Sequence, residues 1–158
     1  MGEVKIQKAT MKNLKDIQKL NLLLFENDKK YDETLNLNWI FGEEGTEYFR
    51  DKISKENSCA FIAIIDNEIV GYLVGWITKA GDYRNISQIA ELENMFVLEQ
   101  YRNLGIGTKL CEEFINWCKL KGIKRIKVVA SAQNTKAINF YKQNKFSDYD
   151  LTLERNLK

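Results

Sequence analysis

Apolar residues near the start of the chain recur at steps of three and four after Thr10. They are Leu14, Ile17, Leu20, Leu24 and Phe25. This spacing gathers apolar side chains on one side of an α-helix, and Thr10 is a suitable N-cap. We therefore expect a short strand over residues 4–8 and then an amphipathic helix. Residues 27–45 are irregular and polar with interspersed aromatic residues, so they could shape a substrate pocket, and a second helix is expected over residues 47–54.

The middle of the chain is rich in β-branched and aromatic residues. Residues 59–65 and 69–78 form two such runs, and the short polar connection Asp66–Glu68 predicts an antiparallel hairpin between them. A third run covers residues 86–97. Its apolar even positions are Ala90, Leu92 and Phe96. This alternation predicts a third strand beside the hairpin.

After the third strand, helical and strand-like patterns alternate. We expect a helix that ends near Gly122, a strand over residues 125–130, a helix over residues 135–144 and a β-like tail from Phe146. A strand, helix and strand in this order form a right-handed crossover between parallel strands. The pattern predicts an α/β (α+β) fold in a single domain over residues 1–158, with a mixed, mostly antiparallel sheet flanked by helices.

Composition limits the environment and the partners. The chain has 158 residues, of which 44% are hydrophobic and 29% charged, and its net charge is +2. These values are typical of a soluble globular protein and give no strong electrostatic footprint for nucleic acid. No apolar run approaches the roughly 18 residues that span a bilayer, and the first residues do not resemble a secretory signal. We expect a cytoplasmic protein that binds neither nucleic acid nor membrane.

The chain contains no histidine. This absence removes the Ser-His-Asp and Cys-His arrangements and most zinc sites, so a general base must be Asp, Glu, Lys, Tyr or Cys. The three cysteines, Cys59, Cys111 and Cys118, include no C-x-x-C pair. We expect no disulfide framework and no metal, with Cys111 and Cys118 on one buried helix face.

A glycine-containing segment, residues 102–108, lies between the third strand and the following helix. Glycines without Cβ allow close approach to the backbone, and a helix N-terminus presents free N–H groups and a positive dipole end, so the segment could hold a phosphate. A Walker A loop is absent, and a dinucleotide-binding fingerprint would require a small residue at Leu110. The segment instead has arginine, two residues, glycine, one residue and glycine, at Arg102, Gly105 and Gly107.

A second element lies downstream: Asn134, Ala137, Phe140, Tyr141 and Phe146 at fixed spacing. Together with the glycine segment it resembles the GNAT superfamily of N-acetyltransferases, in order and spacing, over roughly residues 59–146. The family often has glycine where this chain has Asn103, and asparagine tolerates a positive φ better than most residues.

The resemblance implies a set of residues that bind acetyl-CoA. Met95, Phe96 and Val97 would offer backbone hydrogen bonds to the pantetheine arm. The pyrophosphate would lie on Asn103, Leu104, Gly105, Ile106, Gly107 and Thr108, with Arg102 adding a cation. Asn134 would bond the pantetheine or the adjacent backbone, and Tyr141 would point at the thioester sulfur.

The implied reaction transfers an acetyl group directly to a primary amine in a ternary complex. An aliphatic ammonium has a pKa near 10, so a base must take its proton, and the candidates are Glu91 and Glu93, with Glu93 slightly favoured. Tyr141 would protonate the leaving thiolate. The acceptor could be a small-molecule amine or a protein or peptide amine, and a homodimer is possible. The alternative is a non-catalytic acyl-CoA-binding module.

Overall fold

In the computed structural model, which describes residues 2–157, five strands form one sheet in the order β1-β2-β3-β4-β5. The strands are β1 (Lys5–Lys8), β2 (Ser58–Ile65), β3 (Glu68–Lys79), β4 (Gln88–Val97) and β5 (Ile126–Val128). The first four pair antiparallel with their neighbours, and β5 pairs parallel to β4. The mixed, mostly antiparallel sheet predicted from the sequence is thus confirmed.

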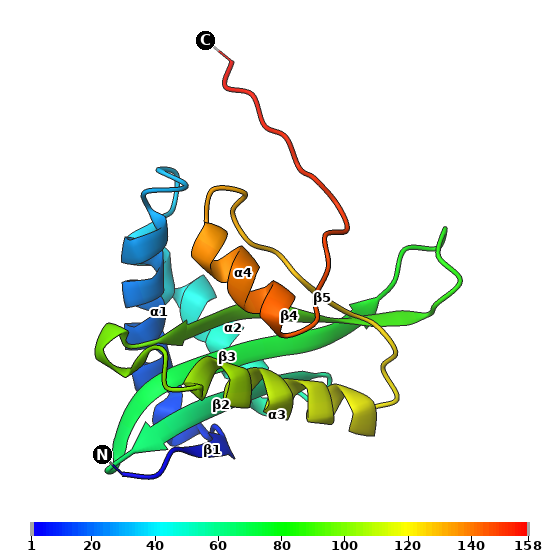
Figure 1. The fold of residues 1–158 in the computed structure, drawn as a ribbon. Coiled ribbons are helices and arrows are strands. Elements are labelled where there is room, and N and C mark those ends of the chain that lie inside the picture. The colour runs from blue at the N-terminus through cyan, green and yellow to red at the C-terminus, as the bar shows by residue number, and fades with distance from the viewer. Residues whose placement is uncertain (1, 158) are drawn as a thin grey trace.

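Within residues 2–157, four α-helices cover the two faces of the sheet (Figure 1). Helices α1 (Leu14–Asp28) and α2 (Glu43–Ser54) pack on one face, and α3 (Ile106–Leu120) and α4 (Thr135–Gln143) pack on the other. Short 3-10 turns precede α1 and α2 at Met11–Asn13 and Leu37–Phe41, and a third occupies Glu99–Tyr101. None of the helices in residues 2–157 has the length and apolarity that a bilayer crossing requires.

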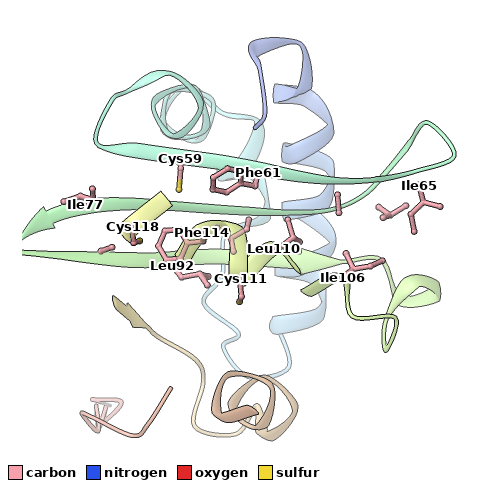
Figure 2. Packing of buried hydrophobic residues seen from close by; sticks show 14 residues of the cluster. Cys59, Phe61, Ile65, Ile77, Leu92, Ile106, Leu110, Cys111, Phe114 and Cys118 are labelled. Atoms are coloured by element: carbon pink, nitrogen blue, oxygen red, sulfur yellow. The ribbon is translucent and has the colours of Figure 1, made fainter. Parts of the chain in front are cut away.

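Each face of the sheet has its own apolar core. Figure 2 shows the core under α3, where Leu110 and Phe114 of the helix meet Phe61 of β2 and Leu92 of β4. The core under α1 and α2 contains Ile17, Ile40, Phe49, Ile62 and Tyr72 among its buried members. The sheet is therefore covered on both sides, and only its edges and strand ends remain for ligands.

The β2–β3 hairpin closes through two residues with positive φ, Asp66 (48°) and Asn67 (66°). Asn and Asp tolerate this region, and two such residues make the turn whose twist suits a hairpin. The antiparallel pairing predicted from this connection is confirmed.

One extra residue in β4 changes which way its side chains face. Val74 pairs with Asn94 but Gly75 pairs with Leu92, so Glu93 forms a β-bulge. Leu92 therefore faces α3, whereas Phe96 belongs to the core under α1 and α2. The alternation in the sequence suggested one apolar face for both, and that interpretation was wrong because a bulge reverses the alternation.

Two further boundaries differ from the sequence prediction. Helix α2 begins at Glu43, four positions before the predicted start, because extended Gly42 precedes it and two acidic residues occupy its first turn. The tail after Phe146 forms no strand in residues 147–157, although its residues alternate as in a strand, because no neighbouring strand pairs with it.

Candidate acyl-CoA and acid-base site

The second half of β4 has one edge without a partner strand. Strand β5 pairs only with Ala90–Leu92. From Asn94 to Val97 the strand pairs with β3 alone, and the bulge residue Glu93 pairs with neither neighbour. A ligand with an extended, amide-containing arm can take the place of the missing strand, since backbone groups on this side have no partner strand. Met95, Phe96 and Val97 lie in this open stretch, as the pantetheine assignment requires.

The glycine segment follows directly and ends in the first turn of α3. Residues 102–105 are exposed, and both Asn103 (φ 62°) and Gly105 (φ 76°) have left-handed backbone conformations. The first N–H bonded within α3 is that of Lys109, which donates to the Gly105 carbonyl. The N–H groups of residues 106–108 have no acceptor within the helix and point out of its N-terminus, which is the arrangement that binds phosphate.

Two residues of the segment also make contacts within the protein. Arg102 is held against β4, where its Nε donates to the Val97 carbonyl at 2.9 Å and its guanidinium lies 5.1 Å from the Phe96 ring centroid. A Cβ added at Gly107 would lie 3.1 Å from the Phe140 ring and 3.9 Å from the Met95 side chain. The small size of Gly107 therefore allows α3 to pack against α4 and β4.

Gly105 and Gly122 provide a matched pair for testing the loop. Both have positive φ, 76° and 72°, with nothing near the position of a Cβ, but they flank opposite ends of α3. Valine at either position should cost about 1–3 kcal/mol of stability. We expect Gly105→Val also to weaken CoA binding at least about tenfold in calorimetric titration, about 1.4 kcal/mol, while Gly122→Val leaves it unchanged. Equal CoA affinity in the two variants would contradict the loop assignment.

Asn134 acts as the N-cap of α4. Its Oδ1 accepts a hydrogen bond from the Ala137 N–H at 3.1 Å, which satisfies one of the free donors at this helix end. Its side chain thus bonds the adjacent backbone, one of the two roles implied by the resemblance. This cap fixes the start of the helix that carries Tyr141.

Tyr141 lies on α4 between two aromatic rings, with Phe140 at 5.3 Å and Phe146 at 5.6 Å between centroids. Burial raises the pKa of its phenol, and the nearby Cys111 and Asp28 raise it further. The hydroxyl receives no hydrogen bond from residues 2–157 that would lower this pKa. Tyr141 is therefore a neutral hydroxyl donor at ordinary pH.

The three cysteines are buried thiols. Burial raises the pKa of Cys111 and of Cys118 to about 12, and raises that of Cys59 further. A thiol that holds its proton is a poor nucleophile, so the site offers no cysteine for a covalent acyl intermediate.

Glu93 ends a chain of hydrogen bonds that runs through the core under α1 and α2. Its Oε2 accepts from the Tyr48 hydroxyl at 2.9 Å and from the Lys52 ammonium at 2.6 Å. The Tyr48 oxygen in turn accepts from Asn94 Nδ2 at 3.1 Å, and Asn94 Oδ1 accepts from Tyr72 at 2.8 Å. The bulge makes this chain possible because it turns Asn94 to the same face as Glu93.

Lys52 is buried at 5% exposure, and its ammonium lies 4.2 Å from the Trp76 ring centroid. The sequence interpretation missed both Lys52 and Tyr48. Their spacing of four, in step with Phe49 and Ile53 on an amphipathic helix, was a signal that they face inward. Glu91, by contrast, pairs with the half-exposed Lys127 of β5 at 3.1 Å.

An open strand edge beside a helix N-terminus with free N–H groups is an arrangement that can bind a phosphate-bearing cofactor with an extended arm. A model of the acetyltransferase (GNAT) family matches residues 21–146, so the chain belongs to this family. It is an acetyl-CoA-dependent acyltransferase that transfers the acetyl group to an amine.

Two relatives match along most of the chain. An N-alpha-acetyltransferase of Sulfurisphaera tokodaii is 28% identical over 153 residues, covering 92% of this chain and 81% of the relative. Streptothricin acetyltransferase A of Bacillus subtilis is 24% identical over 152 residues, covering 89% and 84%. Some relatives are longer, and the chain spans 46% of the uncharacterized N-acetyltransferase MJ1207 of Methanocaldococcus jannaschii.

Solved structures share the fold. A tetramutant of the BH1408 protein from Bacillus halodurans superposes with a TM-score of 0.80 at 21% identity, covering 97% of this chain and 99% of the other. The aminoglycoside 6'-N-acetyltransferase AAC(6')-Ih from Acinetobacter baumannii gives a TM-score of 0.75 at 20% identity, with 99% and 100% covered.

Proposed function

We propose that this protein acetylates a primary amine by direct transfer in a ternary complex, with Glu93 as the base, acting through water, and Tyr141 as the acid. The observation that supports this most is that the pairing of β5 with β4 ends at Leu92, directly before Glu93. It puts a carboxylate at the first position of the open edge on which the pantetheine arm would lie. A base next to the reacting thioester can accept the proton of a bound ammonium during attack.

We propose that the cofactor lies along β4 and ends at α3. Met95 and Phe96 would pair with the pantetheine amides, while the Val97 carbonyl is already bonded to Arg102. The pyrophosphate would lie over Asn103–Thr108, where the N–H groups of the first turn are free. Arg102, whose Nε donates to the Val97 carbonyl, would add a cation beside the pyrophosphate.

The geometry favours Glu93 over Glu91 as the base. Glu91 lies inside the segment where β4 and β5 pair, and Lys127 of β5 holds its carboxylate. Glu93 lies just beyond this pairing. Both donors to Glu93 bond the same oxygen, Oε2, so Oε1 remains for a water that relays the proton.

We propose a cationic amine, either a small molecule or a protein or peptide amine, as the acceptor. Asp28, at the C-terminal end of α1, is half-buried, and its charge acts on both Tyr72 and Tyr141. Burial raises the pKa of Asp28 while Asn27, Lys30 and Arg102 oppose the rise. A carboxylate near the proposed acid would attract an ammonium group to the open end of the site. We further propose a cytoplasmic homodimer.

Thiol release from acetyl-CoA tests this function with a panel of primary amines: an aminoglycoside, a polyamine, lysine and a peptide with a free N-terminus. We expect release with at least one acceptor. Glu93→Gln should lower the rate about 10²-fold near neutral pH and less at alkaline pH, where the amine loses its proton unaided.

Glu91→Gln is the matched control, and its rate should stay within about threefold of wild type, since Glu91 belongs to the paired part of the sheet. A loss in Glu93→Gln that is the same at every pH would assign Glu93 to substrate positioning. Tight CoA binding without release for any amine would favour a non-catalytic acyl-CoA-binding module.

A further inference from the structure

A chain of hydrogen bonds links the buried face of α1 to Glu93. Asn21 of α1 donates from Nδ2 to the Tyr72 hydroxyl oxygen at 2.8 Å. The Tyr72 hydroxyl donates to Asn94 Oδ1 at 2.8 Å, and Asn94 Nδ2 donates to the Tyr48 oxygen at 3.1 Å. The Tyr48 hydroxyl donates to Glu93 Oε2 at 2.9 Å. The chain thus begins at a fully buried asparagine and ends at the proposed base.

The charge on Glu93 sets the direction of every hydrogen bond in this chain. A carboxylate can only accept, so Tyr48 must donate its single proton to it. The Tyr48 oxygen then accepts from the Asn94 amide, which turns the Asn94 carbonyl oxygen towards the Tyr72 hydroxyl. Because Tyr72 donates to Asn94, Asn21 must present its NH₂ group to the Tyr72 oxygen. All the donors therefore point along the chain towards the carboxylate, and each bond strengthens the next.

The far end of the chain has an acceptor without a partner. Asn21 Oδ1 is buried and receives no hydrogen bond within residues 2–157, which costs stability. Reversing the chain would satisfy this oxygen, because Tyr72 would then donate to Asn21. The Asn94 amide would have to turn over, and Tyr48 would donate to Asn94 instead of Glu93. The structure leaves Asn21 Oδ1 unpaired and keeps the bond to Glu93, which indicates that the chain serves Glu93.

We propose that Tyr48, Asn94 and Tyr72 are positioning residues for Glu93, and this rests on the proposed role of Glu93 as the base. Tyr48 and Lys52 hold the same carboxylate oxygen, Oε2, at 2.9 Å and 2.6 Å. Rotation of the carboxylate would take Oε2 away from both donors, so the two bonds together fix its plane. Oε1 is then held in one position for the water that relays the ammonium proton.

Packing fixes the Tyr48 ring independently of its hydroxyl. The ring centroid lies 5.4 Å from that of Trp39 and 4.9 Å from that of Phe49. Burial raises the pKa of the Tyr48 phenol, and the charge of Glu93 raises it further, so the hydroxyl keeps its proton and remains a donor. Replacement of Tyr48 by phenylalanine therefore removes the hydrogen bond to Glu93 and leaves the ring in place.

Steady-state kinetics of Tyr48→Phe test this role, with acetyl-CoA and an aminoglycoside, a polyamine, lysine and a peptide as acceptors. We expect kcat to fall about tenfold near neutral pH while the KM for each substrate stays within about twofold. The loss should shrink at alkaline pH, where the amine needs no base. Tyr101→Phe is the matched control, because Tyr101 also donates to a carboxylate, Glu68 Oε2 at 3.0 Å, and its rate should match wild type. Wild-type kcat in Tyr48→Phe would overturn the proposal.

A double-mutant cycle separates action through Glu93 from a direct contact with substrate. In the Glu93→Gln background, adding Tyr48→Phe should change kcat by less than about twofold, because no base remains to be positioned. Losses that multiply in full would show that Tyr48 acts on its own and would overturn the proposal. Wild-type rates in Glu93→Gln, or no turnover of any amine by the wild-type protein, would refute the proposed function together with this inference. A slow Glu93→Gln beside an unimpaired Tyr48→Phe would refute this inference alone.

Tyr72→Phe tests the remote part of the chain. Without the Tyr72 hydroxyl the Asn94 amide can turn over, and its oxygen can then accept from Tyr48 in place of Glu93. We expect kcat to fall about threefold with unchanged KM, and no further loss in the Glu93→Gln background. The melting temperature of each variant, measured by calorimetry, shows that the protein assayed is folded. Wild-type kcat in folded Tyr72→Phe would show that the chain beyond Tyr48 does not position Glu93.

Discussion

Replacing Lys52 with methionine should be the most destabilising single change in the proposed site, at about 3–5 kcal/mol. The substitution keeps the length of the side chain and its contacts with the Trp76 and Tyr48 rings, since a thioether packs well on aromatic rings. It removes the cation that lies 2.6 Å from Glu93 and leaves a carboxylate with only 19% of its side chain exposed. The expected fall in melting temperature is on the order of 10 °C, measured by calorimetry.

Removing both charges should restore most of the lost stability. In Lys52→Met with Glu93→Gln no unpaired charge remains, and the amide oxygen can still accept from Tyr48. Lys127→Met is the matched control, because Lys127 forms the other ion pair on β4 but has 46% of its side chain exposed. It should cost less than about 1 kcal/mol. Equal losses for Lys52→Met and Lys127→Met would show that burial of the first pair has no energetic consequence.

Much of the sheet could be predicted because its local signals agree with its packing. The β-branched and aromatic runs at residues 59–65 and 69–78, joined by Asp66–Glu68, predict an antiparallel hairpin, and the structure has one. The asparagine at position 103 was expected to tolerate a positive φ, and its φ is 62°. These features depend on residues close in sequence, which is why a local sequence pattern can predict them.

The bulge at Glu93 could not be read from the sequence. One inserted residue leaves the alternation intact on both sides, and the extra residue is visible only from the register with β3. The bulge determines which side chains reach the site. It turns Asn94 toward Tyr48 and places Phe96 on the opposite face of the sheet from Leu92. The hydrophobic pattern within one strand does not reveal the register of that strand with its neighbour.

The burial of Lys52 could not be predicted from the sequence for a related reason. A lysine in an amphipathic helix is usually solvated, and only its partner on another element justifies burial. That partner, Glu93, lies 41 positions later on β4, so no local pattern links them. The tail after Phe146 shows the reverse case, in which a genuine strand pattern has no strand to pair with in residues 2–157.

Tyr141→Phe should lower kcat for acetyl transfer by about 10²-fold or more while the KM for acetyl-CoA stays within about twofold. Only the hydroxyl is lost, and the ring keeps its packing against Phe140 and Phe146. In residues 2–157 the buried polar side-chain atoms without a partner are Asn21 Oδ1 and Trp76 Nε1, so the Tyr141 oxygen is not sealed from solvent. Stability should therefore change little, which separates a catalytic loss from an unfolded variant.

The pH profile adds a second readout for the same residue. An ordinary tyrosine loses its proton near pH 10, but burial, followed by Cys111 and Asp28, raises the pKa of Tyr141. A raised pKa keeps the phenol protonated at alkaline pH, so the wild-type rate should not fall between about pH 8 and pH 10, where the acceptor amine becomes free. Tyr83→Phe, at a tyrosine that is 90% exposed, is the control and should match wild type throughout. Unchanged kcat in Tyr141→Phe would remove Tyr141 as the acid, and the thiolate would then leave without a proton from the protein.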